Sequence, residues 1–118
     1  MSELIQLEKR GHIAVLTIAN PPANTWTADS LAALKATVEE LNADRNIFAL
    51  VVTGQGEKFF SAGADLKTFA DGDRARANDM AQRFGEAFAA LTAFRGVSIA
   101  AVNGYAMGGG LECAMACD

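Results

Sequence analysis

The chain is poor in cysteine, proline and histidine. Its 118 residues contain two cysteines, two prolines and one histidine. Two cysteines are too few for the disulfide framework of a small secreted domain, and a single histidine adds too little to make a zinc site with them. Because Cys113 and Cys117 lie four residues apart, we expect two free, buried thiols on one helix, in a reducing, cytoplasmic setting.

Positive charge and long hydrophobic runs are also scarce. Ten Lys and Arg residues stand against 14 Asp and Glu, a net charge of −4, which argues against a nucleic-acid-binding surface. No apolar run approaches the roughly 20 residues of a membrane-spanning helix, and the first ten residues carry charges where a signal peptide is apolar. With 51% hydrophobic residues, the composition predicts one soluble domain or part of one, with no nucleic-acid or membrane partner.

Hydrophobic spacing predicts strands alternating with helices. Two alternating or β-branched runs flank Gly11 and predict a hairpin, with His12 facing solvent at its turn. The continuous apolar run at 47–53 is typical of a strand buried on both faces. Helical spacing of apolar residues predicts helices across 31–41 and 80–94, so the fold class is α/β with right-handed βαβ crossovers. The predicted strands cover residues 4–8, 12–19, 47–53 and 97–102. The first two form the hairpin, and the last two are expected to be buried.

Polar segments connect these elements. Two prolines make residues 20–24 a loop, and Trp26 beyond it is either a packing residue or a wall of a ligand pocket. Residues 54–58, GQGEK, have two glycines of a nucleotide-binding loop but lack its third glycine and following helix. Residues 70–76 mix charges of both signs, which predicts a mobile, solvated face.

The stretch 97–118, VSIAAVNGYAMGGGLECAMACD, carries the strongest chemical pattern. Three glycines at 108–110 lead from a strand into a helix, which leaves N–H groups unpaired at the positive end of the helix dipole. Such a place suits an oxygen that becomes negative during a reaction. Glu112 lies three residues after Gly109, so both lie on one side of the first helical turn. The pattern fits an acid–base active site; alternatively, the glycines only allow close packing and Glu112 only complements the dipole.

A second small-residue segment occurs at 59–67, FFSAGADLK. The short side chains at 61–64 allow a ligand to approach the backbone closely. The same pattern also fits an ordinary turn into a short helix.

Together, FFSAGADLK at 59–67 and AAVNGYAMGGGLECAMACD at 100–118 resemble the two signature blocks of the crotonase, or enoyl-CoA hydratase/isomerase, family. Paired strands followed by NPPAN at 20–24 also fit, so the resemblance covers the chain from Leu4 onward. It implies a spiral of repeated ββα units and homotrimers, often paired into hexamers. Family chains continue into a second catalytic glutamate and a C-terminal helical region. We therefore expect 1–118 to be the N-terminal part of a single, incomplete domain, inactive alone and with apolar surface exposed.

The resemblance also gives roles to residues. The backbone N–H groups of Ala64 and Gly109 would form an oxyanion hole for a thioester carbonyl, and Glu112 matches the first catalytic glutamate of the hydratases. The coenzyme A moiety would be bound by Ala62, Asp65 and Leu66 at its adenine and by Lys67 at a phosphate. Coenzyme A belongs to the substrate, and neither a metal nor another cofactor is expected.

The function implied is hydration of a trans-2-enoyl-CoA to a 3-hydroxyacyl-CoA, in fatty-acid or amino-acid degradation. Charge moves onto the thioester oxygen as an enolate forms, and losing one backbone donor there typically costs about 3 kcal/mol. Glu112 would act as acid and base. Two alternatives remain: a double-bond isomerase or other enolate-forming member of the family, and a non-catalytic acyl-CoA-binding or assembly module.

Overall fold

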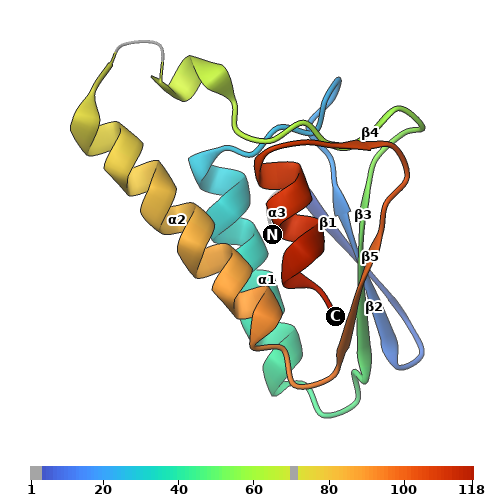
Figure 1. The fold of residues 1–118 in the computed structure, drawn as a ribbon. Helices are drawn as coiled ribbons and strands as arrows, with labels where there is room; N and C mark the ends of the chain where they lie inside the picture. The colour runs from blue at the N-terminus through green and yellow to red at the C-terminus, as the bar shows by residue number, and fades with distance from the viewer. Residues whose placement is uncertain (1–3, 70–71) are drawn as a thin grey trace.

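The computed structural model describes residues 4–69 and 72–118. A four-stranded sheet of order β1-β2-β3-β5 forms one layer, and the three α-helices lie together on one of its faces (Figure 1). The predicted mobile segment at 70–76 lies partly outside the described residues, at Ala70 and Asp71. Its remaining charged residues are exposed around the start of α2 (Arg74–Thr92). No described helix is long and apolar enough to span a membrane.

The sheet contains the predicted hairpin and crossovers. β1 (Ile5–Arg10) and β2 (Ile13–Ile18) are antiparallel, with Gly11 at φ +60° in their turn. β3 (Ala49–Gly54) runs parallel to β2, and β5 (Val97–Ala101) runs parallel to β3. The α/β class and parallel crossovers are therefore confirmed.

The predicted burial of two strands is wrong. In β3, buried Leu50 and Val52 alternate with half-buried residues, and in β5 Val97 and Ile99 are exposed. The reason is the one-sided arrangement of the helices, which cover a single face of the sheet among the described residues (Figure 1). A run of apolar residues shows that both faces of a strand are hydrophobic. It does not show which of the two faces the helices cover.

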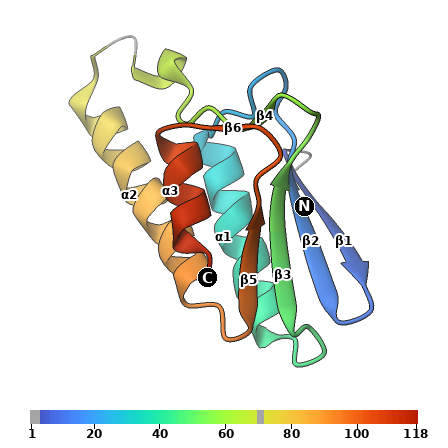
Figure 2. The same cartoon turned by 45° about the vertical axis from the view of Figure 1, so that its right-hand side comes forward.

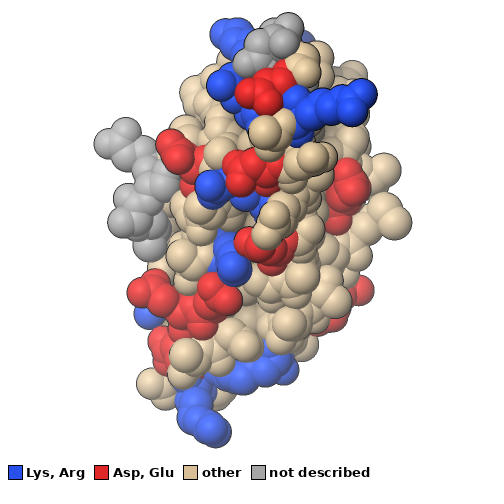
Figure 3. Space-filling view, turned by 90° about the vertical axis from the view of Figure 1, so that its left-hand side faces the viewer, with Lys and Arg blue, Asp and Glu red and all other residues tan. Residues whose placement is uncertain are grey.

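The two long helices bury the predicted apolar stripes. α1 (Ala28–Ala43) begins at a capping box in which Thr27 and Ser30 bond each other's backbone N–H, and it buries Leu31, Leu34, Val38 and Leu41. α2 begins at an Asp73 cap and buries Met80, Ala87 and Leu91, with Phe84 and Phe88 half-buried. Acidic and basic side chains are interspersed on the side of the molecule that carries α2 (Figure 3), and surface ion pairs include Lys35–Glu86 and Arg83–Asp79. This exposed face carries charges of both signs, which is typical of a solvated surface.

A small second sheet positions the glycine-rich segments. β4 (Phe59–Ser61) pairs in parallel with β6 (Tyr105–Ala106), and α3 (Gly109–Ala116) follows directly. Figure 2 shows β6 passing beside β4, with α3 descending between α2 and β5. The segments 59–67 and 100–118, about 40 residues apart in sequence, are thereby brought side by side.

Candidate active site

Two glycine turns meet at the end of the small sheet. Gly63 has φ +100° and Gly108 has φ +51°, a region of backbone conformation that glycine adopts without strain. A Cβ atom on Gly63 would lie 3.0 Å from the Met107 carbonyl oxygen and 3.1 Å from the Gly109 nitrogen. The turns therefore touch, and a side chain at position 63 would push them apart.

Each turn leaves one amide unused. Within the described residues, the N–H groups of Ala64 and Gly109 donate no hydrogen bond. The amides around them are bonded: Gly63 N–H to Ser61 Oγ, Asp65 N–H to Trp26 O and Gly110 N–H to Met107 O. Both free donors directly follow the positive-φ glycines, and Gly109 is also the first residue of α3, where the helix dipole is positive. Such donors suit an oxygen that gains negative charge.

Glycine is also required for close packing behind this turn. A Cβ atom on Gly110 would collide with the Ser61 carbonyl group, and one on Gly109 would lie 2.7 Å from Phe84 Cε1. Helix α3 thus rests directly on β4. The packing interpretation is confirmed for Gly110, whereas a role of the Gly109 amide in an active site stays a prediction.

Most of the predicted site residues line one cavity of about 560 Å³. The Asp65 carboxylate accepts a hydrogen bond from the Lys67 backbone N–H at 3.0 Å and so begins the short 3-10 helix Leu66–Phe69. The Leu66 side chain is 80% exposed. The predicted residues brought together here are Ala62, Ala64, Asp65, Leu66, Lys67 and Gly109.

Glu112 faces a different, adjoining cavity. Its side chain is exposed in the first turn of α3 and lines a space of about 710 Å³ between α3 and α2. The other lining residues are mostly apolar: Ala77, Ala81, Phe84, Gly85, Phe88, Met115 and Ala116. Phe84 connects the two spaces, because it lines the second cavity and packs over Gly109 of the first. The joint action of Glu112 with the two amides stays a prediction.

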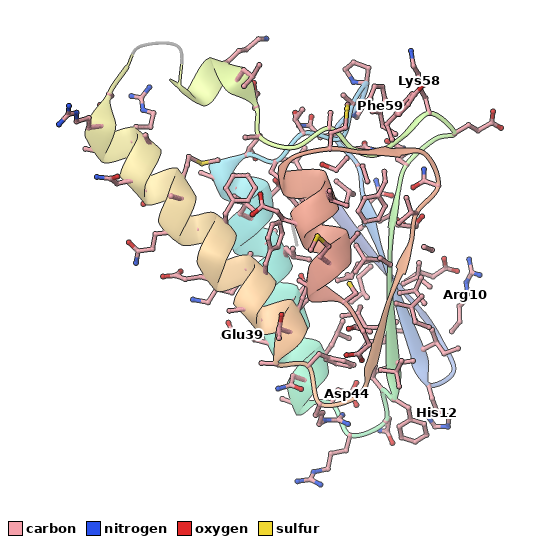
Figure 4. The ribbon with its side chains drawn as sticks, viewed as in Figure 1. Arg10, His12, Glu39, Asp44, Lys58 and Phe59 are labelled. Atoms are coloured by element: carbon pink, nitrogen blue, oxygen red, sulfur yellow. The ribbon has the colours of Figure 1, made fainter. Side chains whose placement is uncertain are left out.

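His12 is remote from this site, as predicted. Figure 4 places it at the opposite end of the sheet from Lys58 and from Phe59, where β4 begins. The His12 ring stacks on Phe48 with centroids 4.3 Å apart, and its Nδ1 lies 2.7 Å from the Asn46 carbonyl oxygen. A carbonyl only accepts, so Nδ1 carries the proton and the ring closes the chain turn before β3.

Two asparagines that the sequence analysis passed over hold the site's framework. Asn103 accepts a hydrogen bond from Gly54 N–H and donates to the carbonyls of Gly56 and Phe59. Asn24 is buried at φ +53° and also donates to Phe59 O. Both carboxamides thus fix the loop that enters β4. The available signals were the glycine after Asn103 and the two prolines shortly before Asn24, but they indicate turns without naming the partners of those turns.

The cysteines are structural. Both thiols are free; Cys113 is buried and Cys117 is half-buried. The predicted burial is therefore confirmed for Cys113, whereas the prediction overestimated the burial of Cys117. Burial raises the pKa of both thiols, so they stay protonated and unreactive near neutral pH. Among the described residues, no three His, Cys, Asp or Glu side chains gather as a metal site.

Mostly parallel strands covered by helices on one face define an α/β protein, and its two glycine turns bring together two backbone amides that have no acceptor among the described residues. A sequence profile of the enoyl-CoA hydratase/isomerase family matches residues 8–118, and the chain belongs to this family. The crotonase-type fold predicted from the two signature blocks is therefore confirmed.

Proteins similar to this chain carry enoyl-CoA hydratase and carnitinyl-CoA dehydratase names. The chain is 38% identical to a short-chain-enoyl-CoA hydratase of Clostridium acetobutylicum and 41% identical to a carnitinyl-CoA dehydratase of Salmonella arizonae, covering 95% and 100% of this chain and 43% and 45% of theirs. It superimposes on the structure of Pseudomonas aeruginosa DspI with a TM-score of 0.97 at 68% identity, over 99% of this chain and 48% of DspI. The chain thus spans about half the length of these proteins.

Proposed function

We propose that the protein carrying this chain adds water to a trans-2-enoyl-CoA thioester and releases a 3-hydroxyacyl-CoA. The observation that carries the proposal is the pair of unbonded amides, Ala64 and Gly109, on touching turns that line one cavity. Two fixed donors beside one space suit a single thioester oxygen whose charge grows as the reaction proceeds. The family and the hydratase and dehydratase names of its relatives support the same chemistry.

The proposed step needs one carboxylate and two backbone N–H donors. Water adds through its oxygen to C3 of the enoyl chain while the Glu112 carboxylate accepts a proton, and the electron pair of the double bond moves onto the thioester oxygen as an enolate. The two amides stabilise that enolate, and loss of either typically costs about 3 kcal/mol of transition-state stabilisation. Glu112, protonated in the addition of water, then gives a proton to C2, which completes the product and restores the carboxylate.

The remaining assignments belong to the same proposal. The thioester's coenzyme A portion lies along Ala62, Asp65 and Leu66, with Lys67 near a phosphate; the exposure of the segment around Leu66 supports an approach from solvent. Neither a metal nor a separate cofactor takes part. The whole protein works as a homotrimer or hexamer in the cytoplasm, in fatty-acid or related acyl-CoA breakdown.

The test follows the loss of the conjugated double bond of crotonyl-CoA with the whole protein. Glu112→Gln should lower kcat at least about 100-fold, because general acid–base catalysis contributes 10²–10⁴-fold, and should leave binding of saturated butyryl-CoA unchanged. Glu39→Gln, an exposed carboxylate on α1 (Figure 4), is the matched control and should keep full turnover.

Other outcomes identify the alternatives. Double-bond migration without net hydration would indicate an isomerase. Tight butyryl-CoA binding with no turnover in the parent protein would indicate a binding module and overturn the proposal.

A further inference from the structure

We infer that Trp26 is the positioning residue that holds the two donor amides in register, an inference that rests on the proposed function. Its backbone forms hydrogen bonds to the residues on either side of Ala64. Trp26 N–H donates to the Gly63 carbonyl at 2.7 Å, and Trp26 O accepts from Asp65 N–H at 3.0 Å, which makes a parallel bridge between Trp26 and Ala64. The carbonyl of the peptide that presents the Ala64 amide and the N–H of the following peptide are therefore both bonded to Trp26.

The ring of Trp26 reaches the other donor. Trp26 Cδ1 lies 3.4 Å from the position of a Cβ atom on Gly109, at the start of α3. The side chain is 0% exposed and packs edge-on against Phe88, with centroids 5.8 Å apart and planes at 69°. Phe84, itself edge-on to Phe88, covers Gly109 from α2. Trp26 is thus bonded to one turn and in ring contact with the other.

The indole acts through its shape. Its Nε1–H group is buried and finds no hydrogen-bond partner among the described residues. A buried donor without a partner is unfavourable, so hydrogen bonding does not explain why the ring lies here. What it supplies is a rigid surface beneath Gly109, between the turn at Gly63 and the aromatic side chains of α2.

Removal of that surface should change the gap between the amides. With a smaller side chain at position 26, the first turn of α3 has room to settle, and the Gly109 nitrogen moves relative to that of Ala64. A displacement of about 1 Å in an active site can cost 100-fold in rate. The residues proposed to bind coenzyme A lie on the other turn and stay in place. The expected signature is therefore a loss in kcat without a matching change in KM.

The experiment uses the whole protein with Trp26→Leu, Trp26→Phe and Phe84→Leu. Turnover of crotonyl-CoA, affinity for butyryl-CoA and the enolate fraction of bound acetoacetyl-CoA, seen by ultraviolet absorbance, are measured. Trp26→Leu should lower kcat about 10- to 100-fold and shrink the enolate fraction, with KM and butyryl-CoA affinity within about threefold. Trp26→Phe keeps an aromatic ring at the same place and should restore most of both. Leu34→Ala, a buried residue of α1, is the control that lowers stability and leaves the enolate fraction unchanged.

Several results would overturn the inference. The first is a folded Trp26→Leu protein with the parent's kcat and enolate fraction. The second is a Leu34→Ala protein that loses both as far as Trp26→Leu does, because that would mark a general effect of stability. If Trp26→Leu does not fold, Phe84→Leu becomes the test, because the half-buried Phe84 also covers Gly109. An unchanged enolate fraction in Phe84→Leu then contradicts the inference. A parent protein that binds acetoacetyl-CoA without forming enolate refutes the proposed function itself, and this inference with it.

Discussion

At the scale of single residues, the glycines at 63 and 108–110 are required for two physical reasons. Gly63 and Gly108 adopt positive φ, which orients the peptides that follow them. Gly109 and Gly110 have no room for a Cβ atom. The first kind sets where an amide points. Of the second kind, Gly110 sets how closely α3 approaches β4, and Gly109 sets how closely Phe84 of α2 packs on α3.

The same substitution should therefore change stability in opposite directions at two positions. Gly110→Ala places a Cβ atom against the Ser61 carbonyl and should lower the free energy of unfolding by about 2–3 kcal/mol, as overpacking does. Gly85→Ala, inside α2 with nothing within 4 Å of the new atom, should raise it by about 0.5–1 kcal/mol through helix propensity. Urea unfolding measures both, and equal signs would contradict the packing explanation.

The buried thiol of Cys113 predicts a loss of stability in alkali. Burial raises its folded-state pKa, whereas the unfolded thiol ionises near pH 8.5. Above that pH the folded state keeps a proton that the unfolded state releases, so stability falls as pH rises, by up to about 1.4 kcal/mol per pH unit. Cys113→Ala should flatten the slope between pH 8.5 and 10 in urea titrations. Cys117→Ala, at a half-buried thiol whose pKa is also raised, is the control and should flatten it less.

Residue patterns predicted the site's glycines and Glu112 because their properties are local. A glycine run before an amphipathic segment indicates a turn entering a helix whatever lies around it. The role of Trp26 depends on its contacts with Ala64 and Gly109, which lie 38 and 83 positions away. A sequence pattern gives no such contacts, so Trp26 was left between a packing residue and a pocket wall. The structure places it in the core.

At the scale of elements, the shortest strands decide where the site forms. β4 has three residues and β6 has two, too few to show any alternation. Their parallel pairing nevertheless joins the turns at Gly63 and Gly108. The long elements were predicted from periodicity, whereas the pairing that creates the site was implied only by the family resemblance.

The Asn103 carboxamide should be essential to that arrangement. Asn103→Asp keeps the oxygen that accepts Gly54 N–H but replaces the donor that faces the carbonyls of Gly56 and Phe59 with a second acceptor. Two lost hydrogen bonds and facing oxygens should lower the free energy of unfolding by about 2–3 kcal/mol. Asn78→Asp, exposed on α2, should stay within about 0.5 kcal/mol. Thermal and urea unfolding compare the pair, and equal effects would rule out a specific role for Asn103.

At the scale of the whole molecule, the open face of the sheet is divided by strand. Register places Ile13, Ala49 and Val97 in one row, and Val15, Val51 and Ile99 in another. On this face of β1 the exposed residues are polar or charged: Gln6, Glu8 and Arg10. Toward β5 and α3 the exposed large side chains become apolar and include Val97, Ile99, Val102, Tyr105, Met107, Leu111 and Met115.

Such a surface should make the polypeptide 1–118 associate with itself and bind a hydrophobic dye. Val97, Ile99, Val102 and Met115 line one hollow at the β5 edge, and a large exposed apolar patch is unusual for a soluble monomer. Ile99 is 47% exposed and Met115 is 74% exposed, so Ile99→Thr with Met115→Lys should remove apolar contact area without emptying the core. Sedimentation at rising concentration should show the double variant shifted toward monomer, with weaker dye fluorescence. Ala32→Ser, exposed on α1, is the control and should behave as the parent. A parent polypeptide that stays monomeric and binds no dye would contradict this prediction, because these apolar side chains would then be buried within the chain itself.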